Sequence, residues 1–362
     1  MRAAVLTEPG EDLTIESLEP LRPGPRDVVV QVGASGICHT DLSVRNGLFA
    51  GIITEAMVGG HEGAGTVVEV GDQVTRVAVG DRVVAAFRPA CGVCHFCMRD
   101  RSHLCDAHGR FLKYPRATRS DGSTAVAMSG LGTFSDVMTC DEASVVRVNS
   151  DLPDSQLALL GCGMTTGVGA VLNTAQLPAG ATTVVVGCGG VGQSVIQGAH
   201  VAGAARIIAV DPLEAKRKVA LQLGATDVID PAAGPADEQV RELTGGRGVD
   251  YAFDVVGIAD IVASTYKMIS KGGMLVLVGY GPMDTQLTFP AFDLQSQEKV
   301  VKGCVAGSSQ VRRDFQRYID LIEGGRLDAA ALVSEEIALA DVNHAMETME
   351  TGEVIRSVIT SF

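Results

Sequence analysis

The stretch TTVVVGCGGVG, residues 182–192, joins a short β-branched run to a glycine-rich turn. The run predicts a buried strand, and a helix is expected to start near residue 191. Gly187, Gly189 and Gly192 match the pattern G-x-G-x-x-G, whose glycines allow a tight turn, close approach of a pyrophosphate and close packing of helix on strand. The start of that helix also offers amide donors to phosphates. The stretch therefore predicts a dinucleotide site in a βαβ fold.

The next expected strand ends in Asp211, nineteen residues after Gly192. A carboxylate at this place accepts hydrogen bonds from both hydroxyls of an adenosine ribose, and it repels the 2'-phosphate of NADP. The sequence therefore favours NAD over NADP. The alternative is a glycine turn that serves packing alone, followed by a solvent-facing aspartate.

Two patterns divide the rest of the chain. Up to residue 150 it shows β segments broken by glycine, the clearest at residues 28–32, 65–70 and 82–86. From residue 151, apolar runs alternate with helical stretches, as in βαβ units with a parallel sheet; the clearest runs are residues 182–186, 206–210, 251–255 and 274–278. After residue 305 we expect helices at 314–323 and 341–350 and a last strand at 354–360.

Composition excludes several classes of protein. The 362 residues are enough for two domains, and no apolar stretch is long enough to span a bilayer. A net charge of -14, with no tryptophan, disfavours binding to nucleic acid. The first twenty residues lack the apolar run of a secretory signal, so we expect a cytoplasmic protein that does not associate with membranes.

A cluster of four cysteines lies in CGVCHFCMRDRSHLC, residues 91–105, with the spacing C-x2-C-x2-C-x7-C. Four thiolates suit a closed, tetrahedral zinc site that stabilises structure and performs no chemistry. Two alternatives remain at this point. A pair of disulfides would require an oxidising compartment, and a redox-active pair would normally open a helix just after a strand. The four residues are Cys91, Cys94, Cys97 and Cys105.

A second set of metal-binding side chains is dispersed. Cys38 lies in GICHTD, His61 in GHEG and Cys162 in GCGMTTG. Two thiolates and one imidazole would leave a fourth position on zinc for water or substrate, as in a catalytic site. The spacing alone does not connect the three, because a single buried cysteine or histidine more often belongs to the core.

Five motifs in this order, GICHTDL, GGHEGAG, CGVCHFC, LLGCGMTTG and GCGGVG, resemble the zinc-dependent alcohol dehydrogenases of the medium-chain dehydrogenase family. The resemblance implies an α/β and β fold with two domains. Residues 1–163 and 306–362 would form a GroES-like, partly open β-barrel catalytic domain, and residues 164–305 a Rossmann domain with a doubly wound parallel sheet. The loop after Cys105 resembles that of the long-loop, two-zinc members, which implies a homodimer whose contact is the edge of the Rossmann domain around residues 274–289.

The resemblance also assigns roles in the catalytic domain. Cys38, His61 and Cys162 would bind a catalytic zinc, and the four clustered cysteines a structural one, giving two zinc ions per chain. Asp41 would orient the His61 imidazole. Thr40 would bond the alcohol hydroxyl, or it could serve only as a helix N-cap. Glu62 would assist ligand exchange behind the zinc, or it could be a buried acid satisfied by a neighbouring arginine.

Further positions match those that contact NAD in the family. Lys216 matches a ribose contact, Arg356 and His39 pyrophosphate contacts, and Thr166, Val191 and Val278 contacts near the nicotinamide; Lys216 and Arg356 could also be ordinary surface charges. Phe87 matches a wall of the substrate pocket. The cofactor-binding set is then Gly187, Gly189, Gly190, Val191, Gly192, Asp211, Lys216, His39, Thr166, Val278 and Arg356.

The function implied is hydride transfer between a small to medium alcohol, or its aldehyde or ketone in reverse, and NAD. Ser43 stands where the best-known animal members carry the outer histidine of a proton relay, and a serine cannot act as a base near neutral pH. A thiol-dependent formaldehyde dehydrogenase is the first alternative, for which the loop cations Arg110, Lys113, Arg116 and Arg119 could anchor the carboxylates of the thiol. The second is a structural or redox-sensor protein with little turnover.

Overall fold

The computed structural model describes residues 1–48, 55–111 and 115–362, and the chain divides into two compact units. The β-rich unit comprises Met1–Gly163, Gln310–Glu323 and Leu332–Phe362, and the parallel-sheet unit comprises Met164–Ser309 and Gly324–Ala331. Residues 306–309 and 324–331, which the sequence places in the β-rich domain, therefore belong to the other unit. One reason is that the Asp328 backbone exchanges hydrogen bonds of 2.6 and 3.1 Å with the Gln197 side chain.

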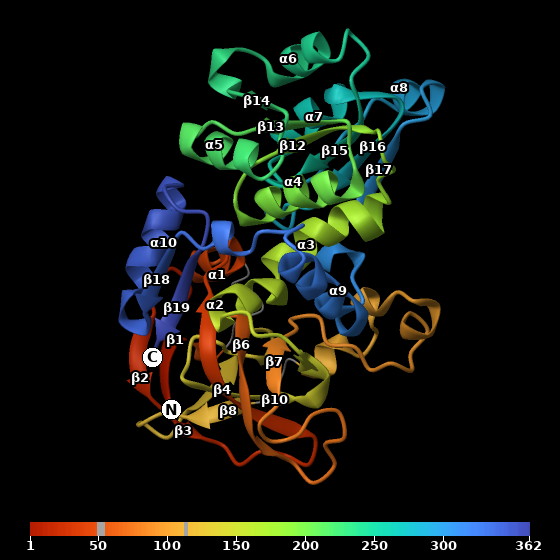
Figure 1. Ribbon diagram of the computed structural model, residues 1–362. Coiled ribbons are helices and arrows are strands. Elements are labelled where there is room, and N and C mark those ends of the chain that lie inside the picture. The colour runs from red at the N-terminus through yellow and green to blue at the C-terminus, as the bar shows by residue number, and fades with distance from the viewer. Residues whose placement is uncertain (49–54, 112–114) are drawn as a thin grey trace. The chain divides into compact units, whose positions relative to one another are not determined.

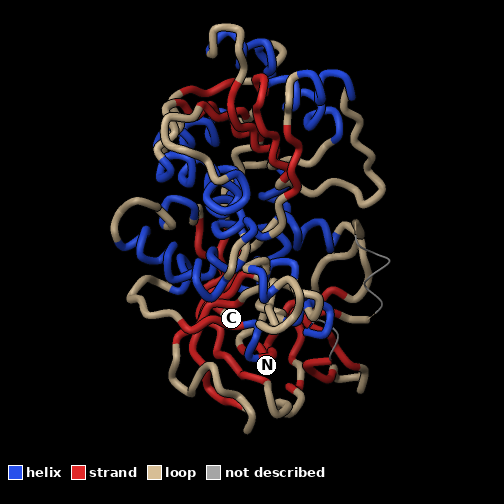
Figure 2. Tube along the Cα trace, turned by 90° about the vertical axis from the view of Figure 1, so that its right-hand side faces the viewer, coloured by secondary structure: helices blue, strands red, loops and turns tan. Residues whose placement is uncertain are grey.

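A parallel sheet forms the centre of the parallel-sheet unit, with helices on both faces (Figures 1 and 2). Within the described residues its strands run in the order β14 (Asp227–Ile229), β13 (Arg206–Val210), β12 (Thr182–Val186), β15 (Val249–Asp254), β16 (Ile269–Leu277) and β17 (Val300–Gly303). The main helices are α4 (Gly190–Ala202), α5 (Glu214–Gln222), α6 (Ala236–Leu243), α7 (Ala259–Met268) and α8 (Ala291–Ser296). This is the expected doubly wound arrangement.

The central strand, β12, is buried on both faces of the sheet, and this burial explains its apolar sequence. Val184 and Val186 of β12 pack in one apolar cluster with Val240 of α6 and Val262 of α7. Val185 faces the opposite side, because side chains alternate along a strand, and it too is fully buried. A strand covered on both faces is apolar at successive positions, as residues 184–186 are.

Two sheets build the β-rich unit within the described residues. The first has the order β2 (Thr14–Ser17), β1 (Arg2–Leu6), β5 (Met57–Val58), β9 (Thr124–Ala127), β8 (Pro115–Thr118) and β3 (Glu19–Pro20). The second has the order β11 (Val145–Arg147), β7 (Arg82–Ala85), β6 (Glu62–Val70), β4 (Asp27–Gly36), β19 (Ser357–Ser361) and β18 (Glu335–Ala338), and β10 (Val137–Asp141) also pairs with β4. Since β19 pairs antiparallel with β4, a late segment of the chain completes a sheet begun by an early one (Figure 1).

Helices and short helical turns complete both units. The remaining α-helices are α1 (His39–Arg45), α2 (Asp154–Ala158), α3 (Gly163–Gly169), α9 (Val311–Glu323) and α10 (Val342–Thr351). The short turns are η1 (Cys97–Arg99), η2 (Ser102–Leu104), η3 (His108–Phe111), η4 (Met128–Gly130), η5 (Glu142–Ser144), η6 (Leu159–Gly161), η7 (Ala170–Ala175), η8 (Pro231–Ala233), η9 (Ala306–Ser308), η10 (Ala330–Leu332) and η11 (Leu339–Asp341). Over the described ranges no single helix is long and apolar enough to cross a membrane; the bent pair Asp154–Gly161 and Gly163–Ala175 reaches that length and apolarity only in combination.

The position of β16 corrects one expectation. Residues 274–289 were expected to include the free edge of the parallel sheet, but β16 lies between β15 and β17, and β17 is the edge strand. The run Val300–Gly303 is only four residues long, so its sequence pattern is weak. A contact through the sheet edge would therefore involve β17, where the Val300 side chain is 41% exposed.

Candidate active site

Four metal-binding side chains meet in the β-rich unit. Cys38 is the N-cap of α1, just after β4; His61 precedes β6, which Glu62 begins; and Cys162 follows η6. All four are buried, and one ligand atom from each lies within 4.8 Å of the others. The fold thus brings together the three dispersed residues that spacing alone could not connect, and it adds Glu62 to them.

Asp41 orients this cluster through both carboxylate oxygens. Its Oδ1 lies 3.0 Å from His61 Nδ1, and its Oδ2 accepts a 2.8 Å hydrogen bond from the Cys38 amide. With Nδ1 donating to Asp41, the lone pair of the imidazole is on Nε2. That atom is buried and has no hydrogen-bond partner among the described residues. A buried nitrogen without a partner, beside two cysteines, is what a metal-binding site requires.

Electrostatics separate the two thiols. The Cys162 hydrogen bond, together with the charges of Arg356 and His61, holds the pKa of Cys38 well below its ordinary value despite burial. The same hydrogen bond and burial raise the pKa of Cys162. Cys38 is therefore the first thiol of the pair to ionise. Asp41 raises the pKa of His61 against the effect of burial. Two sulfurs and one imidazole nitrogen are the donors that zinc prefers, so the residues fit this ion.

Arg356 is the partner of Glu62. Its Nη2 lies 3.3 Å from Glu62 Oε1 and 3.7 Å from Cys38 Sγ, and the same Glu62 oxygen accepts a 3.0 Å hydrogen bond from the Gly163 amide. Arg356 is only 4% exposed, so its interpretation as a surface charge is wrong. Burial raises the pKa of Glu62 to about 7, although Arg356 opposes this shift. The structure thus contains the arginine that the second interpretation of Glu62 requires, and sequence reasoning did not pair the two residues.

The remaining expected residues of this unit lie around the cluster. The Phe87 ring meets the His61 imidazole edge-on, with 5.8 Å between ring centroids. Thr40 Oγ1 is 3.7 Å from Cys38 Sγ, and its side chain is exposed. The N-cap of α1 is Cys38, so the alternative role of Thr40 as N-cap is wrong. His39 is exposed at the first position of α1, and Ser43 is half-buried in the same helix.

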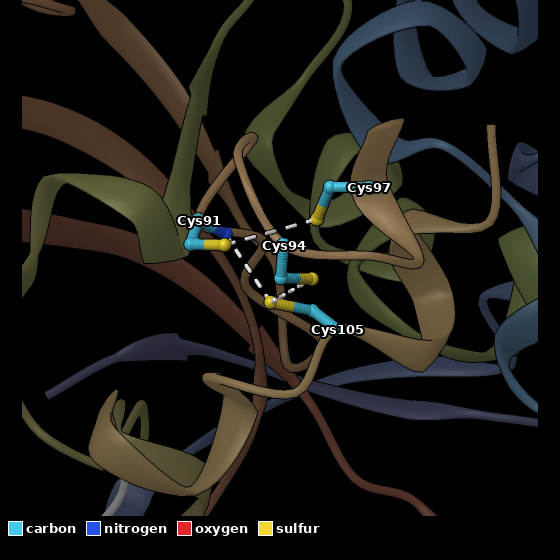
Figure 3. Close-up of side chains that lie close together, drawn as sticks. All are labelled: Cys91, Cys94, Cys97 and Cys105. Carbon is cyan, nitrogen blue, oxygen red and sulfur yellow. Dashed lines mark hydrogen bonds between the residues drawn. The ribbon is translucent and has the colours of Figure 1, made fainter. Parts of the chain in front are cut away.

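The four clustered cysteines also converge (Figure 3). Their sulfurs all lie within 4.8 Å of one another, with 4.0 Å between Cys91 and Cys97 and 3.9 Å between Cys94 and Cys105. These distances far exceed the S–S bond of about 2.05 Å, and all nine cysteines of the chain are free thiols, so the disulfide alternative is wrong. Amides of the loop donate to the sulfurs, and such bonds lower the pKa of Cys94 to about 6. Four thiols around one point fit a structural zinc ion.

Helix α9 holds this cysteine loop in place. Arg312 Nη2 donates to the Ala90 carbonyl oxygen at 3.1 Å, and Gln310 Nε2 donates to the Asp100 carbonyl oxygen, also at 3.1 Å. Inside the loop the apolar contacts are few, formed by Ala90, Ala107 and the cysteines themselves. Metal ligation must therefore supply much of the local stability.

The glycine turn has the geometry that its motif predicts. Gly187 has φ +92°, a conformation that favours glycine, and a Cβ on Gly192 would lie 1.8 Å from the Gly187 carbonyl oxygen. Gly189 is the N-cap of α4, and a Cβ there would meet nothing within 4 Å. The space before the helix N-terminus is therefore open to a phosphate.

Asp211 follows β13 and is 6% exposed. Its Oδ2 accepts a hydrogen bond from the Cys188 amide at 2.8 Å, and its Oδ1 accepts one from Leu213 at 2.9 Å. The alternative of a solvent-facing aspartate is therefore wrong. A buried residue that the sequence analysis missed is Gln193, whose amide donates to the carbonyl oxygens of Cys188 and Lys216 and so connects the turn to α5. A glutamine in an apolar helix was the only signal for it.

The other NAD candidates belong to the parallel-sheet unit. Val191 and Lys216 are half-buried in α4 and α5, Thr166 is half-buried in α3, and Val278 is buried directly after β16. Among the loop cations, Arg116 pairs with Asp27 at 2.9 Å and Arg119 binds both carboxylate oxygens of Glu16 at 2.8 and 2.9 Å. These two are thus engaged and unsuited to anchor a substrate. Arg110 is exposed, and Lys113 lies outside the described residues.

Comparison with known proteins agrees with this geometry. A family model described as alcohol dehydrogenase GroES-like domain matches residues 24–150, and one described as zinc-binding dehydrogenase matches residues 190–324. The chain is 38% identical to the putative alcohol dehydrogenase D of Mycobacterium tuberculosis and 38% identical to the NDMA-dependent alcohol dehydrogenase of Amycolatopsis methanolica, over 99% of this chain and 98% of each relative. It is 33% identical to the S-(hydroxymethyl)glutathione dehydrogenase of Paracoccus denitrificans, over 99% of both chains.

Solved structures show the same likeness along the whole chain. Benzyl alcohol dehydrogenase from Acinetobacter calcoaceticus has a TM-score of 0.92 at 30% identity, covering 100% of this chain and 99% of that one. A zinc-binding-domain alcohol dehydrogenase protein from Burkholderia ambifaria has a TM-score of 0.93 at 30% identity, covering 99% and 98%.

Fold and site together define a zinc-dependent oxidoreductase with a GroES-like domain and a Rossmann domain. The chain belongs to the zinc-dependent medium-chain alcohol dehydrogenase family. The family, fold class and cofactors expected from the sequence are confirmed, and the alternative of a structural or redox-sensor protein loses its support.

Proposed function

We propose that this enzyme transfers a hydride between a small to medium alcohol and NAD, and reduces the matching aldehyde or ketone in reverse. The observation that carries the proposal is the buried set Cys38, His61 and Cys162, in which His61 Nε2 has no hydrogen-bond partner among the described residues. The relatives named as alcohol dehydrogenases support the choice of substrate class.

In this proposal each residue of the metal cluster and its surroundings has a separate role. Zinc held by Cys38, His61 and Cys162 supplies Lewis acidity that makes an alcohol hydroxyl more acidic, and NAD supplies the hydride acceptor. Asp41 fixes the tautomer and the direction of the His61 ring. Thr40 takes the hydroxyl proton at Oγ1 and passes it outward, and its exposed side chain leaves that path open to water. Ser43 cannot act as the terminal base, so protons leave through water or His39.

Glu62 and Arg356 form the back of the cluster in this proposal. Glu62 keeps one carboxylate oxygen, Oε2, without a hydrogen-bond partner among the described residues, beside the three zinc ligands. That free oxygen could take part in ligand exchange, while Arg356 balances the buried charge. Arg356 is already bonded within the β-rich unit, and its pyrophosphate contact stays a prediction.

For the cofactor, we propose that the amides of Gly190 and Val191 bind the pyrophosphate, with Gly187, Gly189 and Gly192 making room for it. Asp211 would accept from the adenosine ribose while its present partners hold it at the end of β13. Lys216 and His39 would contact the ribose and the pyrophosphate, and Thr166 and Val278 would pack near the nicotinamide. Phe87 would form a wall of the substrate pocket beside His61.

We also propose a cytoplasmic homodimer. The nine free thiols are consistent with a reducing compartment. A dimer contact through β17 would cover the exposed Val300 side chain. Sedimentation of the purified enzyme tests the oligomeric state, and a tetramer or a monomer would contradict the proposal.

Thiol-dependent formaldehyde oxidation is a second candidate, because relatives at 33–35% identity are named S-(hydroxymethyl)glutathione dehydrogenase. A screen of alcohols with NAD and NADP, and of formaldehyde with and without added thiol, separates the two. We expect NAD reduction by alcohols without thiol, and two zinc ions per chain. Formaldehyde turnover that needs the thiol, with no oxidation of simple alcohols, would favour the second candidate, and a single zinc ion would mean that one metal site is wrong.

A further inference from the structure

A cluster of nitrogen-bearing side chains lies beside the active site and takes no part in the mechanism above. It consists of Arg88, which follows β7; His103, in η2; and His108, which begins η3. His103 is 9% exposed, and Arg88 and His108 are half-buried. Arg88 Nε and the Nδ1 atoms of both histidines are buried without a hydrogen-bond partner among the described residues. Three such nitrogens in one region are available to bond a ligand or a water molecule.

The charge around these nitrogens is positive. Burial and the charge of Arg88 together lower the pKa of His108 to about 4, and the charges of Arg101 and Arg88 also act on His103. Every charged side chain that acts on the two imidazoles is thus an arginine, and within the described residues no acid forms an ion pair with Arg88. At neutral pH the His108 imidazole is uncharged and has one N–H to donate, and Arg88 supplies the positive charge.

The cluster is connected to the zinc ligands through one ring. Arg88 Cζ lies 5.8 Å from the centre of the Phe87 ring, and that ring lies 5.8 Å from the centre of the His61 imidazole. The guanidinium is therefore no farther from the His61 ring than the sum of these two distances. A short carbon chain or one aromatic ring spans such a gap.

We propose that Arg88, His103 and His108 bind a carboxylate on the alcohol substrate, so that the preferred substrates are hydroxy acids with the hydroxyl at the far end. This deepens the proposed function and rests on it. A carboxylate supplies the negative charge that pairs with the Arg88 guanidinium. Its lone pairs accept hydrogen bonds from the imidazole N–H groups. Arg88 is half-buried and no acid among the described residues pairs with it, so its charge is available to a substrate carboxylate.

The test compares ω-hydroxy carboxylates with unbranched primary alcohols of the same chain length, each with NAD. We expect one chain length at which kcat/KM for the acid exceeds that for the alcohol by about tenfold or more, as for one charge-assisted hydrogen bond. Arg88→Gln and His108→Asn should reduce this ratio toward one. Arg99→Gln is the matched control, because Arg99 is exposed on the same loop and, among the residues that the structure describes, bonds to His95 alone; this variant should keep the ratio.

The outcomes are distinguishable. If neutral alcohols are oxidised but no chain length favours the acid, or if Arg88→Gln lowers both rates equally, the carboxylate site is wrong and the proposed function stands. If neither series reduces NAD, the proposed function is wrong. Calorimetric titration with hexanoate, a carboxylate without a hydroxyl, then still tests the carboxylate site. Binding to the parent enzyme that is lost in Arg88→Gln supports the site. No binding of hexanoate to the parent enzyme overturns it. Zinc content and melting temperature of each variant show that its fold is intact.

Discussion

The Arg356 guanidinium donates to the Glu62 carboxylate across 3.3 Å, and 4% and 0% of these side chains are exposed. Arg356 directly precedes β19, and Glu62 begins β6, so the pair joins distant parts of the sequence within one sheet. Taking two charges out of water is costly, and such a pair adds little net stability compared with apolar residues. Removing one partner is different, because the other charge stays buried alone.

Arg356→Met should therefore destabilise the enzyme by about 3–5 kcal/mol. The same substitution at Arg147, which pairs with Asp81 and is 66% exposed, should cost less than about 1 kcal/mol. Thermal unfolding of the zinc-loaded proteins measures both changes. Adding Glu62→Gln to Arg356→Met should restore part of the lost stability, because no unpaired charge then stays buried. Equally small losses for the Arg356 and Arg147 variants would contradict the buried ion pair of Arg356 with Glu62.

The two cysteine sets should respond differently to mutation. Cys38→Ser should abolish turnover and remove one zinc ion from a protein that still folds. Cys97→Ser should also remove one zinc ion, but it should chiefly lower the melting temperature, since the cysteine loop has few other apolar contacts. Zinc quantification with a melting curve separates the two results. Cys140→Ala, a buried thiol in neither set, should retain both ions; its losing zinc would contradict the assignment of donors.

Asp41→Asn tests the orientation of the zinc ligand. The amide keeps the size of the side chain but weakens the acceptor for His61 Nδ1 and the Cys38 amide. Loss of such a supporting carboxylate typically costs 10- to 100-fold in metal affinity or activity, roughly, and we expect a change of that order here. Asp12→Asn, at a carboxylate that is 59% exposed and pairs with Arg45, should leave zinc affinity unchanged. Competition with a chelator measures the zinc affinity of each variant. Equal zinc affinities of Asp41→Asn and Asp12→Asn would count against the role of Asp41.

Asp211→Ser should raise the preference for NADP over NAD, measured as the ratio of kcat/KM values, by about tenfold or more, because the negative charge facing the ribose is lost. The side chain also accepts from Cys188 and Leu213, so a fall in stability of about 1–3 kcal/mol should accompany the change. Asp211→Asn, which keeps one acceptor and removes the charge, separates the two effects. An unchanged cofactor ratio in both variants would mean that Asp211 does not face the ribose.

The pair of Glu16 and Arg119 should make stability depend on pH. Hydrogen bonds from Arg119 lower the pKa of Glu16 below its value of 4.5 in an unfolded chain. A depressed carboxyl pKa contributes stability above the unfolded value, and this contribution is lost as the pH falls through the lower folded value. Arg119→Gln should therefore cost about 0.5–1 kcal/mol at neutral pH, and the difference should vanish in acid. Arg110→Gln, on an exposed side chain, should show no such convergence when unfolding is followed across pH.

Features formed by contiguous residues could be predicted from the sequence, and features formed by residues far apart in the chain could not. Strand β12 and the glycine turn follow from contiguous residues, because a strand covered on both faces is an unbroken apolar run. The cysteine loop is equally local. The catalytic cluster is not, since its ligands come from three separate segments, and only the motif order of a known family joined them.

Other features left no readable pattern. Strands such as β5 and β3 are two residues long and owe their existence to pairing with neighbours. The partnership of Arg356 with Glu62, and of Arg119 with Glu16, depends on tertiary contacts across long sequence separations. The edge position of β17 was missed for a similar reason, because sheet order is a property of pairing and not of the strand itself.

The pairing of β19 with β4 has a consequence for how the enzyme is made. Residues 357–361 leave the ribosome more than three hundred positions after β4, so the end of β4 at Ser35 and Gly36 lacks this partner while the whole parallel-sheet unit has already been synthesised. Arg356 arrives with the same segment, and until then Glu62 has no cation beside it. A nascent chain that stalls before this strand already contains the parallel-sheet unit and the ligands Cys38, His61 and Cys162, but it lacks Arg356 and leaves the end of β4 unpaired. Residues 356–361 therefore complete both a sheet and the charge balance beside Glu62 at the end of synthesis.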